Sequence, residues 1–123
     1  MIRILWAVLA VLLLTLLIVI CVHRGWGAAA LSVAFGAMPD LALIGAFAGR
    51  GRLKPNRVGL YNLLHAVPLA LIVASLGGVL GALGVDAWML TVAGIAWIAH
   101  IAVDRACGYG LRATDGAILP VSA

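Results

Sequence analysis

The sequence predicts an all-α fold, a bundle of four transmembrane helices, from its composition and from the length and number of its apolar stretches. Of its 123 residues 66% are hydrophobic and only 10% are charged, a composition well outside that of a soluble domain. Each apolar stretch reaches the roughly 20 residues with which a helix crosses a bilayer. The expected helices cover residues 4–22, 27–49, 58–80 and 86–108. Their connections are too short to fold separately, so residues 1–123 are expected to form a single integral membrane domain.

The first helix follows a short basic start but is expected to stay in the protein, because its apolar run exceeds the ~7 to 15 residues of a secretory signal. The second and third helices contain Pro39 and Pro68. Each proline removes a backbone donor, which leaves the carbonyls of Phe35 and Leu64 without their helical partner. Both helices are therefore expected to be kinked, with the freed carbonyls bonded to a polar side chain or an enclosed water.

The fourth helix is expected to end in the block Gly108–Tyr109–Gly110, with Gly110 as a left-handed cap. The tryptophans lie mostly near the ends of the expected helices, as in an aromatic belt: Trp6, Trp26, Trp88 and Trp97.

The basic residues predict the orientation of the helices. With four spans, both termini and the middle loop share one side, which holds Arg3, Arg50, Arg52, Lys54, Arg57, Arg105 and Arg112. Only Arg24 lies on the other side. Because an excess of Lys and Arg in short loops marks the cytoplasmic face, both termini are expected in the cytoplasm. The net charge of +4 is thus mainly a topology signal, and without a soluble basic face a nucleic-acid partner is not expected.

The lipid bilayer is the expected partner of such a chain. Small residues also recur at helical spacing, in the pairs Gly45 and Gly49, Ala74 and Gly78, and Gly77 and Gly81. Such pairs let helix backbones approach closely, either within the chain or in a homodimer.

Strongly polar residues inside the expected helices are few: Asp40, Asn62, His65, His100 and Asp104. An ionisable side chain at a bilayer centre costs about 2.5 to 3.5 kcal/mol on insertion scales, so these residues should face protein or water. With a rise of about 1.5 Å per residue, His65 and Asp104 lie about 12 Å from the basic inner interface, Asp40 about 15 Å and His100 about 18 Å. Three helices therefore present acids and imidazoles at a similar depth, in the cytoplasmic half or close to the midplane.

The facing of these residues agrees with their depth. His100 and Asp104 are four apart and share one face of the fourth helix, while Asn62 and His65, three apart, share one face of the third. Asp40 directly follows the proline of the second helix. A single polar chamber between helices two, three and four is therefore expected.

Two imidazoles and two carboxylates are ordinary ligands for a divalent metal such as Zn, Fe or Mn. Three or four of the groups His65, His100, Asp104 and Asp40 are then expected to bind the metal. A carboxylate left unbound, Asp40 or Asp104, is the candidate for the catalytic general base. A lipid-like or small molecule is the natural ligand at this location. If the chain is an enzyme, the best interpretation is a metal-dependent membrane hydrolase.

Two other interpretations stay open. The same groups can form the proton relay of a small transporter or proton-coupled carrier. They can also be purely structural, with Asp40 or Asp104 paired to a protonated histidine or to Arg105, and Asn62 capping a proline-freed carbonyl. The chain would then be a non-catalytic membrane assembly protein.

The segments "MPDLALIG", "GLYNLLH" and "AHIAVDRACGYGLR" together resemble a family of small bacterial integral membrane proteins, domain of unknown function 4260. The resemblance covers roughly residues 36–112 and is most specific in the last segment. It implies as signature positions Asp40, Tyr61, Asn62, His65, His100, Asp104, Arg105, Gly108, Tyr109 and Gly110. Among these, the ligand-binding candidates are Tyr61, Asn62, Arg105 and Tyr109.

The resemblance implies a multi-pass protein of the bacterial inner membrane, but no activity. Members of the family often carry a Glu near the start of the first helix and a Thr-His pair after the Gly-Tyr-Gly block. This chain has "RILWAV" and "RATDGAILP" there, which lowers the weight of a catalytic interpretation. The layout is more distantly similar to bacterial membrane-bound metal-dependent hydrolases, and hydrolysis therefore stays among the hypotheses.

Overall fold

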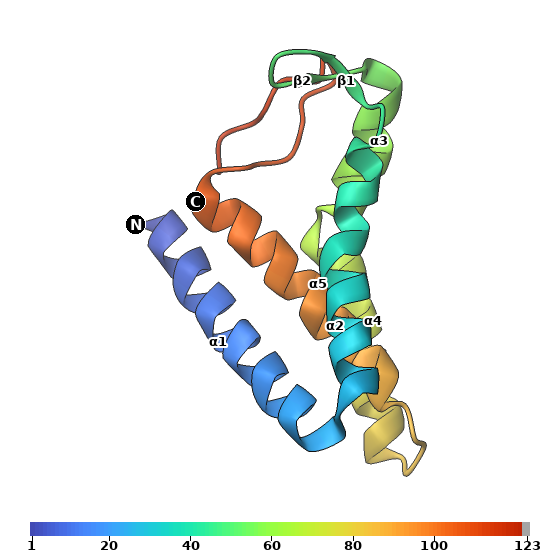
Figure 1. Cartoon of the computed structure of the whole chain (residues 1–123). Helices are drawn as coiled ribbons and strands as arrows, with labels where there is room; N and C mark the ends of the chain where they lie inside the picture. Colours follow the sequence, from blue (N-terminus) through green and yellow to red (C-terminus); the bar gives the residue numbers. More distant parts are fainter. Residues whose placement is uncertain (122–123) are drawn as a thin grey trace.

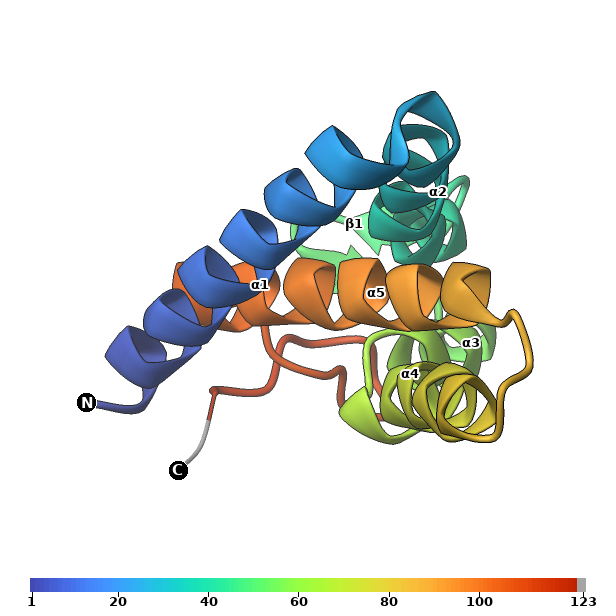
Figure 2. The same ribbon diagram turned by 90° about the horizontal axis from the view of Figure 1, so that it is seen from below.

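The computed structural model describes residues 1–121, which are mainly helical (Figures 1 and 2). The elements follow one another as α1 (Ile2–Arg24), α2 (Trp26–Ala37), the 3-10 helix η1 (Met38–Leu43), the short strands β1 (Phe47–Gly49) and β2 (Arg52–Leu53), α3 (Pro55–Leu64), α4 (Val67–Ala82) and α5 (Trp88–Cys107). An extended segment after α5 returns to the hairpin formed by β1 and β2.

Four helical segments are long and apolar enough to cross a membrane, which confirms the coarse prediction of a mainly helical chain with four candidate membrane spans. They are Ile2–Arg24, Trp26–Leu43, Pro55–Ala82 and Trp88–Cys107. Their surface agrees with this conclusion, since large apolar side chains such as Leu12, Ile18 and Ile72 are mostly exposed. Exposed apolar area on this scale is stable against lipid and unfavourable against water.

Helix α5 is the centre of the bundle and packs against α1, α2 and α4 (Figure 2). Its contact with α4 depends on small residues, because a Cβ at Gly94 would overlap Ala74 and a Cβ at Gly77 would overlap the backbone of Thr91. Ala74 and Gly77 thus lie in a helix interface as expected, whereas the neighbouring Gly78 faces open space.

The predicted second helix, residues 27–49, is wrong in its last turns. The helix changes from α to 3-10 at Met38, next to Pro39, and ends at Leu43. The chain then turns through Gly45, whose φ of 65° lies in the left-handed region that favours glycine, and enters the hairpin. Short apolar strands beside a helical stretch have the same composition as the helix itself, which is why the hairpin was not expected.

The other helix ends also differ from the prediction. The expected third helix is two α-helices, because α3 ends at Leu64 and α4 begins at Val67. The left-handed cap of α5 is Gly108, with φ 95°, rather than Gly110. Gly110 instead lies against the backbone of Leu119, where a Cβ would overlap the carbonyl oxygen.

The C-terminal segment covers the hairpin at one end of the bundle (Figure 1). The backbone N–H of Leu53 donates to the Gly116 carbonyl over 3.0 Å, and Arg112 pairs with Ile118 in an isolated β-bridge. The buried Arg112 donates through Nη1 to the Gly51 carbonyl over 2.6 Å. The hairpin and the C-terminal segment therefore form one small cap on the helices.

Candidate functional site

Asp40, His65, His100 and Asp104 meet at one place in the structure. The Nε2 atom of His65 lies 3.7 Å from Oδ1 of Asp40 and 3.5 Å from Oδ2 of Asp104. The Nε2 atom of His100 lies 3.6 Å and 3.5 Å from the same two oxygens. We call these four residues the Asp/His cluster. Four of the five polar residues expected in one chamber between helices two, three and four are therefore together, whereas Asn62 bonds to the backbone of Arg112.

Three helical elements carry the cluster. His100 and Asp104 lie one turn apart on α5 and so face the same side. Asp40 lies in η1, where the 3-10 turn follows the buried Pro39. His65 follows the last residue of α3, at the break before α4.

Two side chains of α5 satisfy the backbone at this break. The indole Nε1 of Trp97 donates to the Leu64 carbonyl over 2.7 Å, which is the carbonyl that Pro68 leaves without a helical partner. Arg105 donates through Nη2 to the carbonyl of His65 over 2.8 Å. Trp97 is therefore the polar side chain that was expected to bond the freed Leu64 carbonyl. It is buried in the middle of α5, so it does not belong to an aromatic belt.

The protonation of His65 follows from one hydrogen bond. Its Nδ1 lies 3.0 Å from the Tyr61 carbonyl, and a carbonyl oxygen can only accept, so Nδ1 carries a hydrogen. In the neutral imidazole, Nε2 then holds a bare lone pair. Tyr61 also stacks on the imidazole, with ring centroids 3.9 Å apart, and fixes its plane.

This lone pair lies in an unusual environment. The His65 side chain is 1% exposed, and within residues 1–121 the Nε2 atoms of His65 and His100 make no hydrogen bond. Each Nε2 instead faces two carboxylate oxygens at distances longer than a hydrogen bond. A lone pair beside carboxylate oxygens is repulsive unless a proton or a metal cation lies between them.

The spacing of the atoms fits a metal cation. Ligand atoms about 2.1 Å from a tetrahedral zinc ion lie about 3.4 Å from one another. The four nitrogen–oxygen distances of 3.5 to 3.7 Å are close to this value. The ligand atoms of Asp40, His65 and His100 all lie within 4.8 Å of one another, so these three residues can hold one ion. The bond from His65 Nδ1 to a carbonyl is also the usual second contact of a metal-binding histidine.

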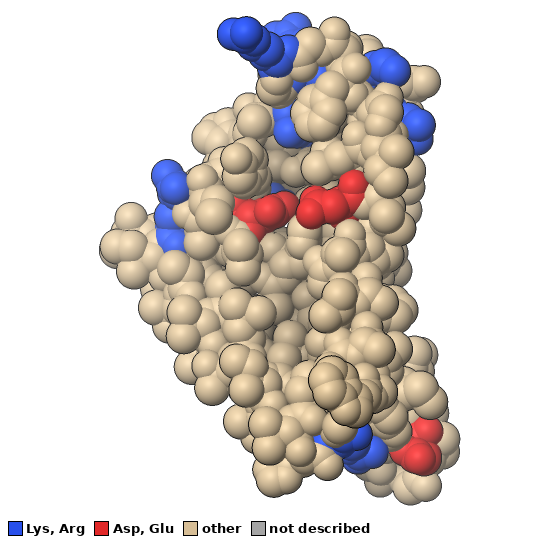
Figure 3. Space-filling view, viewed as in Figure 1, with Lys and Arg blue, Asp and Glu red and all other residues tan. Residues whose placement is uncertain are grey.

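The cluster is open on one side. The side chain of Asp40 is 56% exposed and that of Asp104 is 20% exposed, in contrast to the buried His65. In Figure 3 acidic side chains lie beside a hollow of the surface, between the α1 and α2 sides of the molecule. A ligand can therefore reach the carboxylates from the surface.

Three of the four residues predicted to bind a ligand instead form hydrogen bonds with the backbone of the protein. Tyr61 donates its hydroxyl to the Gly110 carbonyl over 3.4 Å, and Arg105 donates through Nη1 to the Tyr109 carbonyl over 2.5 Å. The side chain of Asn62 holds Arg112 in both directions, donating to its carbonyl over 2.9 Å and accepting from its N–H over 2.8 Å. Asn62 thus caps no proline-freed carbonyl.

The bonds of Tyr61 and Asn62 attach the C-terminal segment to α3, and the bond of Arg105 attaches it to α5. Polar atoms of the Tyr61, Asn62 and Arg105 side chains are thus already used in hydrogen bonds within the protein. The side chain of Tyr109 is half exposed. Ligand binding by these residues stays a prediction. Sequence reasoning missed the role of Arg112, whose guanidinium lies 5.2 Å from the centroid of the Tyr61 ring. The available signal was its position at the end of the segment "GYGLR".

The comparisons with known proteins identify a family and nothing closer. No curated protein and no solved structure matches the chain. A family model described as a domain of unknown function matches residues 3–118, which is nearly the whole chain. The motifs at Asp40, His65 and His100 all lie within this match. The chain therefore belongs to the family of domain of unknown function 4260 (DUF4260).

Proposed function

We propose that the protein is a membrane-embedded, metal-dependent hydrolase that acts on a lipid-like or small amphiphilic substrate. The observation that carries the proposal is the buried Nε2 lone pair of His65, which faces the carboxylates of Asp40 and Asp104 beside the equally unbonded Nε2 of His100.

The charge of the cluster supports a divalent ion. With neutral imidazoles, the two carboxylates carry two negative charges in a region of low dielectric, where uncompensated charge is expensive. Two protons shared among the imidazoles and carboxylates would also neutralise the cluster, but two charged imidazoles with ring centroids 5.4 Å apart would repel each other. One divalent cation such as Zn, Fe or Mn neutralises it without like-charge repulsion.

The residues then take separate roles. His65, His100 and Asp40 hold the ion, because their ligand atoms share one small volume. A bound ion polarises a substrate oxygen and activates a water molecule. Asp104 is the general base, because it is the carboxylate of the cluster outside the group Asp40, His65 and His100 and its side chain is partly accessible. Tyr61 and Arg105 position His65 through its ring and its carbonyl.

The location in the cell is part of the proposal. We place both termini, the hairpin and the Asp/His cluster on the cytoplasmic side of a bacterial inner membrane, because the basic residues of the chain gather there. The breaks next to Pro39 and Pro68 kink their helices and leave room for the cluster. An amphiphile in the inner leaflet would reach the site through the exposed side of Asp40.

Metal content decides the first half of the proposal. Protein purified in detergent, supplied with zinc, iron or manganese and then dialysed, is analysed by inductively coupled plasma mass spectrometry. We expect about one ion per chain, lost in His65→Ala and His100→Ala. His23→Ala is the matched control, because this exposed third histidine lies at the end of α1, far along the bundle from the cluster. Equal metal content in all four proteins would refute the site.

Turnover decides the second half. The metal-loaded protein in lipid nanodiscs is incubated with amphiphilic esters, amides and phosphodiesters, and the products are measured by mass spectrometry. Asp104→Asn should keep the metal and lose at least about a hundredfold in rate, as expected for a general base. A metal-loaded protein that hydrolyses none of these substrates would leave the metal site standing and reject the hydrolase.

A further inference from the structure

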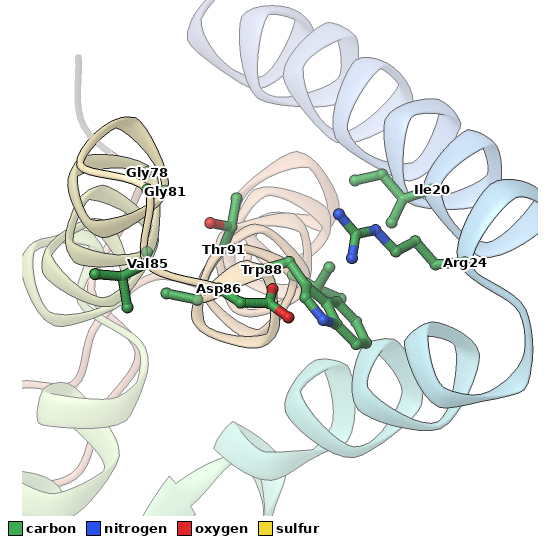
Figure 4. A pocket seen from close by; sticks show the side chains of 12 residues that line it. Ile20, Arg24, Gly78, Gly81, Val85, Asp86, Trp88 and Thr91 are labelled. Atoms are coloured by element: carbon green, nitrogen blue, oxygen red, sulfur yellow. The ribbon is translucent and has the colours of Figure 1, made fainter.

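A hollow with both signs of charge lies at the end of the bundle opposite to the Asp/His cluster. It has a volume of about 490 Å³, and Figure 4 shows side chains from α1, α4, α5 and the α4–α5 loop around it. The first and third candidate spans end beside this hollow, at Arg24 and Ala82, and the fourth begins there, at Trp88. Span ends lie where the lipid headgroups are, so a ligand of this hollow is at headgroup depth.

The two charged side chains of the hollow, Arg24 and Asp86, are not paired with each other. The guanidinium of Arg24 lies 4.9 Å from the centroid of the Trp88 ring, a cation–π contact that fixes its position. Asp86 belongs to the wall of the same hollow. Among residues 1–121, neither Arg24 nor Asp86 forms an ion pair with another side chain. In Figure 4 Arg24 extends from α1 towards Trp88, and Asp86 approaches the same indole from the loop.

Glycines of α4 leave room beside these charges. At Gly78 and Gly81, no atom lies within 4 Å of the position that a Cβ would take. At Gly77, one turn from Gly81, a Cβ would overlap the backbone and hydroxyl of Thr91, so α4 and α5 touch there. Gly77 and Thr91, which make this close contact, also line the hollow, and the absent side chains of Gly78 and Gly81 leave space beside them.

We propose that this hollow binds a zwitterionic headgroup that carries a phosphate and a primary ammonium group. The phosphate pairs with Arg24 and the ammonium with Asp86, since the two side chains line one cavity and form no ion pair with each other. A purely anionic headgroup would satisfy Arg24 and be repelled by Asp86. Phosphoethanolamine has the required charges, whether it belongs to a lipid or is a free molecule.

Native mass spectrometry of the protein, released from nanodiscs of equal phosphatidylethanolamine and phosphatidylglycerol, tests the preference. The wild type should retain the ethanolamine lipid over the glycerol lipid by about tenfold, as one charged hydrogen bond implies. Asp86→Asn should abolish this preference without weakening the binding of phosphatidylglycerol. Arg24→Gln should weaken the binding of both lipids. Both side chains are exposed, so the variants should fold, which circular dichroism checks. Arg50→Gln, an exposed arginine between the strands of the hairpin, is the matched control and should behave as the wild type.

Soluble phosphoethanolamine separates the two sources of the ligand. Displacement of the retained lipid by millimolar phosphoethanolamine would support a site for the headgroup itself. Retention of the lipid preference without displacement would support a site that also needs the acyl chains. Equal binding of both lipids by the wild type, or an unchanged preference in Asp86→Asn, would overturn the proposal.

Discussion

Replacing Trp97 by Phe should destabilise the protein through one lost hydrogen bond. The indole N–H donates over 2.7 Å to the Leu64 carbonyl, which Pro68 deprives of its helical donor, and Trp97 is only 5% exposed. In the variant this buried carbonyl has no partner. An unsatisfied buried group of this kind costs about 1–3 kcal/mol, to which the smaller ring adds a packing loss.

A double-mutant cycle separates the hydrogen bond from the packing loss. Ala66 is extended between α3 and α4, so Pro68→Ala brings a new donor to the Leu64 carbonyl only where the break closes into one helix. In that closed helix the N–H at residue 68 donates to the carbonyl, and Trp97→Phe should cost less in this background. We expect a coupling free energy of about 1 kcal/mol between the two substitutions, measured by reversible unfolding in mixed micelles with circular dichroism. The packing loss is common to both backgrounds and cancels. Protection of the residue 68 amide from hydrogen exchange shows that the break has closed in Pro68→Ala. A coupling within about 0.3 kcal/mol of zero in that protected background would refute the assignment of Trp97 as the partner of this carbonyl.

Two further predictions concern packing and the C-terminal segment. Gly94→Ala should destabilise the protein by about 1–3 kcal/mol, because the new Cβ would overlap Ala74. Gly78 faces open space, so Gly78→Ala should leave the stability unchanged. Equal melting temperatures of the two variants would contradict this packing. Asn62→Leu should release the segment that contains Arg112, because both bonds to its backbone are lost. Amide hydrogen exchange of residues 112–118 should then become faster, and the exposed Asn56→Leu should leave it unchanged.

The spans and the convergence of the Asp/His cluster could be predicted because both depend on one-dimensional information. The depth of His65, His100 and Asp40 along their helices follows from counting residues, and the shared face of His100 and Asp104 follows from helical periodicity. The structure brings these residues together at 3.5 to 3.7 Å. Their role as metal ligands stays a prediction.

The cap and the partners of the broken helix could not be predicted in this way. Trp97 bonds a carbonyl 33 residues away, and Arg112 bonds one 61 residues away, so these contacts depend on how separate segments pack. The apolar composition of the hairpin strand Phe47–Gly49 is also indistinguishable from that of a helix end. Local sequence patterns therefore predict how deep a polar group lies along its helix, but they do not predict which distant residue bonds to it.

The central position of α5 has a consequence for the making of the protein. This helix supplies His100 and Asp104 and also the donors for the Leu64 and His65 carbonyls. Because α5 is synthesised after the other spans, the Leu64 and His65 carbonyls lack these hydrogen-bond donors until α5 enters the membrane. The earlier segments consequently have no assembled polar centre of their own, and the last span is the one that creates it.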